Sequence, residues 1–510
     1  MSENRTKKAF VNVAFNFANQ IVTLVLSFIS RTVFIYAFGV EYLGINGLFT
    51  DVLGLLSMAD LGFNTVMVYS LYQPLAEKDT DKIASLVFFY RKVYIFIAIV
   101  VSVVGVAFIP FLPFVVNLEK ELKDLNIYYL LSLANVVFSY LWFYKTSILT
   151  ADQKNYVIVK ISMLMNVLKI IAQIFVIMIL RNYIVYLAIG TGFVLINNIV
   201  ASKVAVKHYP FIKQGKSLEK REQKEIMKNI GSGFLYKVSS VLLNSTDNIL
   251  ISVMVGTVAV GLYSNYLMLQ TKISCFYILV FSSITASIGN LIAKENERKR
   301  YEIFQCEQVV SYIICGVLIP CYISLVNDFI VLWLGEKFVL SDLTVWMIGL
   351  NMYLGCVLQP LWSYRDATGL FRKTKWIMVI CAIFNIVLSV MFGVLMDLPG
   401  ILLASSISRL LTYVWYEPKV LFKEYFNLRP YKYYFSLVGN FVLILGLSYI
   451  GFRLGRGLVV ESVGGWLLKA IIIGSVSVLI TSMVYKNSNG TQLIKEKIVN
   501  MFKRDEDNRN

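Results

Sequence analysis

The chain has few of the residues that metal centres and catalytic sites most often use. Its 510 residues include one histidine, His208, and six cysteines, none of them in a CxxC pair. We therefore expect no metal centre, which needs several such ligands together, and we expect the cysteines to pack as small apolar residues. Only 15% of the residues are charged, whereas soluble proteins have roughly 25%.

Nucleotide and catalytic motifs are also missing. The sequence contains no GxxxxGK[ST], HExxH, GxSxG or dinucleotide-binding loop, and the GKS at 215–217 follows Pro210 where the phosphate loop needs glycine. The predicted outer loops are short, as at 39–41, 181–182 and 397–400, and leave little room for a membrane enzyme. We expect a protein that is not an enzyme and has no cofactor, with coupling to H⁺ or Na⁺ left open.

Apolar residues are abundant. They make up 57% of the chain, the mean hydropathy is +0.68, and the apolar runs repeatedly exceed the ~20 residues that span a bilayer as a helix. The runs are continuous, which excludes an alternating β-barrel and predicts an all-α membrane protein. The first run is too long for a signal peptide. The 14 predicted spans cover 10–38, 42–72, 84–117, 125–149, 155–180, 183–206, 229–255, 258–291, 303–334, 342–366, 374–396, 398–422, 431–452 and 464–485.

Lysine and arginine predict the orientation. They gather in segments that are cytoplasmic when the N-terminus is inside, so we expect both termini in the cytoplasm. This asymmetry accounts for the net charge of +17 without a nucleic-acid partner. The basic segment 213–228 has two interpretations, a solvated linker or a surface that lies against anionic membrane lipids.

The chain contains an internal repeat. A shift of 217 positions places Gly39 on Gly256 and Gly44 on Gly261. Each half then holds six spans in the same orientation, as in transporters built from parallel repeats. The predicted parts are a first six-helix bundle (1–206), a basic cytoplasmic linker (207–228), a second bundle (229–422), two extra helices (423–485) and a polar tail (486–510).

One face of the first span of each half is polar. Asn16, Gln20 and Arg31 recur at helical spacing in span one, and Lys237, Asn244 and Asp247 lie on the shifted face in span seven. A pair of such faces most simply lines one cavity. The alternative is that each polar face, its charged residues included, packs against neighbouring helices through hydrogen bonds.

Charges inside the spans are costly and therefore usually face water or a partner. The cations are Arg31, Lys169, Lys237, Lys272, Arg409 and Lys469, and the acids are Asp51, Asp60 and Asp247. This surplus of cations favours an anionic cargo such as a phosphate. Pairing with the acids is the alternative for some cations, and Lys469 is interpreted as a residue near a helix end that reaches the interface.

The region EYLGINGLFTDVLGLLSMADLGF (41–63), followed by VYSLYQPLAEKD (68–79), resembles the polysaccharide-transporter branch of the multidrug/oligosaccharidyl-lipid/polysaccharide exporter superfamily, the O-antigen-type flippases. The resemblance implies a MATE-like V of two six-helix bundles around a cavity, in a bacterial cytoplasmic membrane. It implies flipping of an undecaprenyl-diphosphate-linked oligosaccharide to the outer leaflet, with a glycan polymerase and glycosyltransferases as partners.

In such a flippase the cavity cations meet the diphosphate. The expected substrate-binding residues are Arg31, Lys169, Lys237, Lys272, Arg409, Asn16, Gln20 and Asn244. Asp60 and Asp247 are candidates for ion coupling. Two other functions stay open, a drug or cation antiporter of the same superfamily and a non-transporting scaffold of a glycan-assembly complex.

Overall fold

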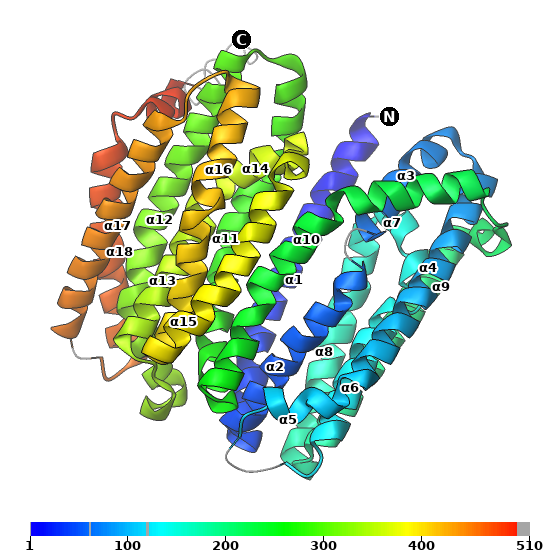
Figure 1. Ribbon diagram of the computed structural model, residues 1–510, viewed down its shortest axis with the longest axis horizontal. Coiled ribbons are helices and arrows are strands. Elements are labelled where there is room, and N and C mark those ends of the chain that lie inside the picture. The colour runs from blue at the N-terminus through cyan, green and yellow to red at the C-terminus, as the bar shows by residue number, and fades with distance from the viewer. Residues whose placement is uncertain (1, 61–62, 119–121, 459, 497–510) are drawn as a thin grey trace. The chain divides into compact units, whose positions relative to one another are not determined.

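The computed structural model describes residues 2–60, 63–118, 122–458 and 460–496. Every regular element in these ranges is helical (Figure 1), which confirms the predicted all-α class. The chain divides into two compact units, Met1–Gly261 and Leu262–Asn510.

The first unit contains ten helices among its described residues and the first turn of an eleventh. They are α1 (Ser2–Phe38), α2 (Val40–Leu56), α3 (Phe63–Glu77), α4 (Thr80–Ala107), α5 (Leu112–Val115), α6 (Leu125–Tyr140), α7 (Ser147–Ala151), α8 (Asn155–Leu180), α9 (Tyr183–His208), α10 (Lys220–Met254) and the start of α11 (Thr257–Lys294). Short 3₁₀ turns, among them η4 (Pro210–Gln214), connect several of these helices.

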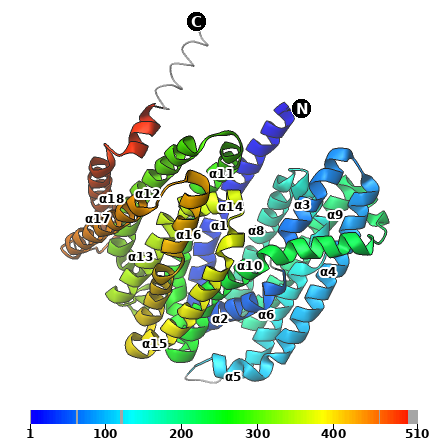
Figure 2. The same cartoon turned by 45° about the horizontal axis from the view of Figure 1, so that its top comes forward.

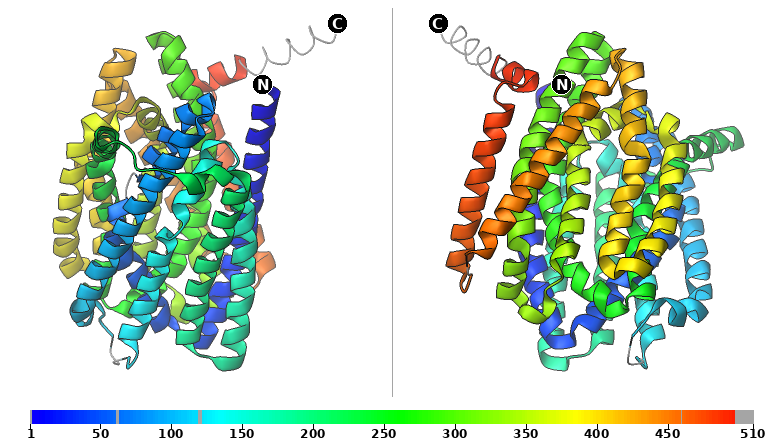
Figure 3. Two further views of the ribbon diagram at one scale, coloured as in Figure 1. Left: turned by 90° about the vertical axis from the view of Figure 1, so that its right-hand side faces the viewer. Right: turned by 60° about the vertical axis from the view of Figure 1, so that its left-hand side comes forward.

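The second unit contains the rest of α11 and the helices that follow it. They are α12 (Glu297–Leu334), α13 (Asp342–Val357), α14 (Gln359–Thr368), α15 (Phe371–Leu411), α16 (Tyr413–Leu421), α17 (Tyr431–Arg456) and α18 (Val463–Tyr485). Within this unit α12 packs against α13, α17 and α18, and the right panel of Figure 3 shows α18 beside α17.

Special backbone conformations separate consecutive helices. Gly39 (φ 87°) joins α1 to α2, and its repeat equivalent Gly256 (φ 127°) joins α10 to α11. Glycine accepts a positive φ without the strain that a side chain would add. Asp397 (φ 53°) breaks α15 two residues before Pro399. The chain therefore turns where the sequence predicts spans to end, near residues 38, 255 and 396.

The number of spans is less clear than their positions. In the described residues nine helices are long and apolar enough to cross a membrane, or ten if the bent pair α13 and α14 forms one span. One of the nine, Lys373–Phe426, has 54 residues and includes the break at Asp397. The predicted spans 229–255 and 258–291 are helical but do not count among the nine, so the total of 14 is not confirmed.

Exposed apolar stripes mark the surfaces that face lipid. On α17 the side chains of Phe435, Val438 and Val442 are 78%, 60% and 63% exposed, and their spacing places them on one helical face. On α4 the side chains of Phe96 and Val103 are exposed in the same way. Large apolar stripes of this kind are stable in lipid and not in water, so the chain is an integral membrane protein.

The helix α10 packs within the first unit, against α2, α3 and α5. Figure 2 shows its N-terminal part lying across α3 and α4. The division predicted from the sequence assigns residues 229–254 to the second bundle. The contacts in the structure group all of α10 with the first unit. The five predicted parts stay a prediction.

Candidate membrane-embedded site

Arg31 lies on α1 among polar groups of the first unit. Its side chain is half-buried and interacts electrostatically with Tyr186 of α9, whose hydroxyl is hydrogen-bonded with Ser30. Arg31 precedes Gly39 by eight residues, which at 1.5 Å per residue is about 12 Å along the helix. The guanidinium is therefore well inside the apolar segment but nearer the end that the lysine and arginine pattern places outside.

An aromatic cluster closes this end of the first unit. It joins α1, α2, α6 and α9, and its members are Phe34, Phe38, Tyr42, Tyr128, Tyr183 and Tyr186. The Tyr183 ring lies 4.9 Å from that of Tyr42 and 4.8 Å from that of Tyr128, measured between centroids. Ring pairs at these separations add about 0.5–1.5 kcal/mol each beyond burial. The cluster therefore gives Arg31 a rigid apolar neighbour on one side, an arrangement that the sequence analysis missed.

A second polar contact links α2 to α10. The Asn248 amide donates a hydrogen bond of 2.6 Å to Asp51, and Asp247 lies close enough to act on the same carboxylate. The 217-residue shift places Arg31 on Asn248. The two repeats thus carry a donor at the same position, a guanidinium in one and an amide in the other.

The repeat is also visible in how α2 meets the start of α11. A Cβ added to Gly44 would lie 2.0 Å from the carbonyl oxygen of Thr257, and a Cβ added to Gly261 would lie 2.3 Å from that of Val40. Under the shift of 217 positions, Val40 corresponds to Thr257 and Gly44 corresponds to Gly261. Each contact is therefore the repeat equivalent of the other, as a local two-fold axis requires.

The predicted site residues occupy different depths. In the first unit Gln20, Lys169, Lys237 and Asp247 are all half-buried, like Arg31. Lys237 precedes Gly256 by 19 residues, or about 28 Å of helix, so it lies near the other end of the membrane segment from Arg31. The side chains of Asn16, Asp60 and Asn244 lie outside the described residues.

In the second unit the predicted cations have separate surroundings. Arg409 of α15 interacts electrostatically with Tyr277 of α11 and with Tyr413. Lys272 of α11 is half-buried. A chamber shared by these residues and those of the first unit stays a prediction.

Three acids of the second unit were missed, and they change the charge balance. Asp328 pairs with Lys469, Glu417 lies 3.5 Å from Arg365, and Glu307 is buried. Lys469 lies in the second turn of α18, near the helix end, and its side chain is only 4% exposed. Counting these three acids together with Arg365, the partner of Glu417, gives seven cations and six acids, so the surplus of cations is smaller than the sequence predicts.

Among the described residues no three His, Cys, Asp or Glu side chains gather in a way that could hold a metal ion. The structure places polar groups in two separate contacts, Arg31 and Ser30 with Tyr186, and Asn248 with Asp51. Such groups can bind a charged or hydroxyl-rich head group through hydrogen bonds.

Comparisons with known proteins give a family and a fold. The model of a family described as "Polysaccharide biosynthesis protein" matches residues 9–287, which is more than half of the chain. No curated protein sequence matches the chain significantly.

Solved structures with the same fold include two kinds of transporter. The lipid II flippase MurJ in an inward closed conformation has a TM-score of 0.66 and 16% identity, with 94% of this chain and 99% of that chain covered. An inward-facing multidrug resistance MATE family transporter of the MOP superfamily has a TM-score of 0.55 and 15% identity, with 77% and 93% covered. The Vibrio cholerae MATE transporter VcmN has a TM-score of 0.54 and 14% identity, with 82% and 98% covered. The family match confirms the predicted resemblance, and the shared fold of these structures confirms the predicted fold class.

Proposed function

This chain belongs to the polysaccharide biosynthesis protein family, and we propose that it is a flippase for a lipid-linked oligosaccharide. The proposed substrate is an undecaprenyl-diphosphate-linked oligosaccharide, moved from the cytoplasmic to the outer leaflet for cell-surface polysaccharide. The proposed location is a bacterial cytoplasmic membrane, with both termini in the cytoplasm and a polymerase and glycosyltransferases as partners. No enzymatic step is involved.

The observation that carries the proposal is the placement of Arg31. A guanidinium in an apolar helix is costly unless water or a partner reaches it, and here it is held beside the Tyr186 hydroxyl in a protein of the polysaccharide family. Arginine grips a phosphate through two parallel hydrogen bonds. The proposed binding set contains Arg31 together with Asn16, Gln20, Lys169, Lys237, Asn244, Lys272 and Arg409.

The proposed mechanism is alternating access. The lipid tail stays in the bilayer while the sugar-diphosphate head binds to the embedded polar residues. A head with about two negative charges moves outward along an inside-negative potential, which contributes roughly 4.6 kcal/mol at 100 mV. Flipping is then favourable without a coupled ion, and Asp60 and Asp247 are the proposed residues if H⁺ or Na⁺ is coupled.

The experiment is surface-glycan display in cells that depend on this chain. Arg31→Ala should abolish display while the protein inserts at normal levels, and Arg31→Lys should retain part of it because the charge remains without the planar fork. The matched control is Arg453→Ala, which removes an exposed arginine. Normal display by the Arg31→Ala variant would assign Arg31 a structural role and remove the main support for the flippase.

A drug or cation antiporter is the second candidate. The smaller surplus of cations weakens the argument against a cationic cargo, and Asp51 and Asp247 lie close together in the first unit. A flippase predicts unchanged drug susceptibility on overexpression, whereas an antiporter predicts resistance that Asp51→Asn removes. A scaffold predicts neither resistance nor flipping.

A further inference from the structure

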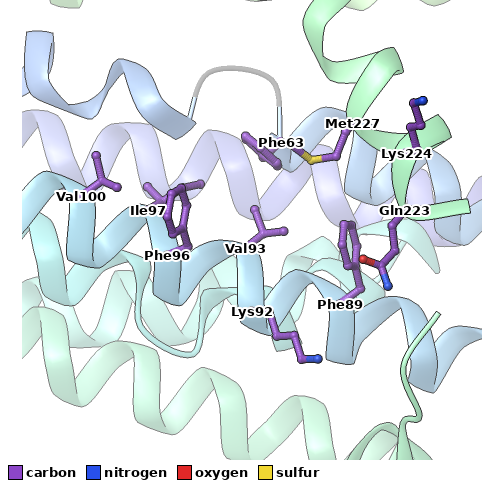
Figure 4. A pocket seen from close by; sticks show the side chains of 10 residues that line it. All are labelled: Phe63, Phe89, Lys92, Val93, Phe96, Ile97, Val100, Gln223, Lys224 and Met227. Atoms are coloured by element: carbon purple, nitrogen blue, oxygen red, sulfur yellow. The ribbon is translucent and has the colours of Figure 1, made fainter. Parts of the chain in front are cut away.

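A groove in the first unit runs between α4 and the N-terminal part of α10. It has a volume of about 550 Å³, and Figure 4 shows its lining, in which Phe63, Phe89 and Phe96 are the largest apolar side chains. The polar lining is limited to Lys92, Gln223 and Lys224. The groove therefore combines an apolar surface with two cations.

The cations mark the depth of the groove. Arg91 and Lys92 directly precede a long uncharged run of α4 that begins at Val93. Basic residues at such a boundary lie at the level of the lipid head groups, on the cytoplasmic side in the predicted orientation. Phe96, Ile97 and Val100 follow on the same helix at the level of the acyl chains, and Phe96 is 67% exposed, so the groove is open to lipid.

Several contacts hold α10 and the segment before it against α4. Lys82 of α4 pairs with Glu222 of α10. Within the segment itself, the Gln223 amide donates a hydrogen bond of 2.8 Å to the carbonyl oxygen of Leu218. A Cβ on Gly215 would lie 2.1 Å from the carbonyl oxygen of Ala84, so only glycine allows this close approach. The residues of α10 that line the groove are thus packed against α4 as part of the first unit. The segment before α10 is also packed there and is not a solvated linker.

We propose that this groove binds one anionic glycerophospholipid of the cytoplasmic leaflet. One acyl chain lies along Phe96, Ile97 and Val100, and the phosphate lies at the end of the groove that Lys92, Gln223 and Lys224 line. Neither lysine forms an ion pair within the part of the chain that the structure describes. Basic pockets at this depth recognise anionic head groups.

The occupant is a phospholipid and not the glycan substrate because of what lines the groove. Apart from the two lysines, Gln223 is the one polar lining residue among those described, so the groove offers few hydrogen bonds for sugars. The segment 213–228 adds to the attraction, since its six basic residues outnumber its three acidic ones. This inference is independent of the proposed flippase activity.

The test is native mass spectrometry of the purified full chain, released from nanodiscs that contain equal amounts of phosphatidylglycerol and phosphatidylcholine. The wild type should retain one phosphatidylglycerol per chain and little phosphatidylcholine. Lys92→Gln/Lys224→Gln should reduce that retention at least tenfold. The matched control is Lys203→Gln/Lys207→Gln, which removes two exposed lysines of α9 and should bind as the wild type does.

A second variant tests the apolar groove while both of its lysines remain. Val93→Trp fills the groove, keeps both lysines and should also lose the bound lipid. Equal losses in the two double-lysine variants, or equal retention of both lipids by the wild type, would overturn the proposal. Displacement of phosphatidylglycerol by an equal concentration of undecaprenyl phosphate would also overturn it and assign the groove to the substrate tail.

Discussion

Gly44 of α2 lies so close to Thr257 at the start of α11 that a methyl group on it would be 2.0 Å from the Thr257 carbonyl oxygen. The same relationship holds between Gly261 and Val40, the residues 217 positions away. The shift of 217 positions turns the first contact into the second, with the glycine and its partner exchanged between the two repeats. Such a pair of equivalent contacts is expected when the two repeats pack about a local two-fold axis. The close contacts of Gly44 and Gly261 thus show the internal repeat in the structure as well as in the sequence.

The first prediction is that Gly44→Ala destabilises the protein. The backbone of Thr257 cannot move away as a flexible side chain would, so overpacking should lower the free energy of unfolding by about 1–3 kcal/mol. The measurement is the midpoint of thermal aggregation in detergent. Gly54→Ala on the same helix is the control, because its Cβ would meet the Ser245 hydroxyl at an ordinary 3.6 Å. Equal midpoints for the two variants would contradict the close contact.

The second prediction concerns Glu307 of α12. Its side chain is 3% exposed, and neither carboxylate oxygen has a hydrogen-bond partner among the described residues. A buried polar group without partners costs about 1–3 kcal/mol. Glu307→Met, which keeps the length of the side chain, should therefore raise the unfolding midpoint.

The control for Glu307 is Glu302→Met on the same helix, where the carboxylate pairs with Arg298 and Lys299 and replacement should bring no gain. A higher unfolding midpoint for Glu307→Met together with a loss of transport would show that the carboxylate serves function at the expense of stability. A fall in the midpoint of Glu307→Met would contradict the absence of partners.

The third prediction is a loss of stability at high pH that depends on Tyr209. Burial, together with a hydrogen bond to Asp152, raises the pKa of this tyrosine to about 12. The folded state then holds the phenolic proton more tightly than the unfolded state, so stability falls as the pH rises from about 10 towards 12. Tyr209→Phe should show a shallower fall in the thermal midpoint over this window. Tyr431→Phe, an exposed residue, should keep the wild-type profile.

Helix positions could be predicted from the sequence because they depend on local features. The glycines at 39 and 256 adopt the positive φ that ends a helix, and the break at Asp397 precedes Pro399. The shift of 217 predicted which residues are equivalent, and the glycine crossing agrees with it.

Partners between helices could not be predicted in the same way. Arg31 and Tyr186 are 155 positions apart, and Lys469 and Asp328 are 141 apart. Nothing in the local pattern of either helix indicates which residue of another helix it meets. The acids Asp328, Glu307 and Glu417 carry a sequence signal, since each lies in or beside an apolar run, and including them would have reduced the predicted surplus of cations.

The most direct test of the proposed function is flipping in proteoliposomes that contain the purified chain and a fluorescent undecaprenyl-diphosphate-linked oligosaccharide. With an inside-negative potential, the wild type and Arg453→Ala should move the labelled lipid from the inner to the outer leaflet, where a membrane-impermeant quencher reaches it. Arg31→Ala should leave it in the inner leaflet. A wild-type rate no faster than that of protein-free vesicles, with correctly inserted protein, would contradict the flippase.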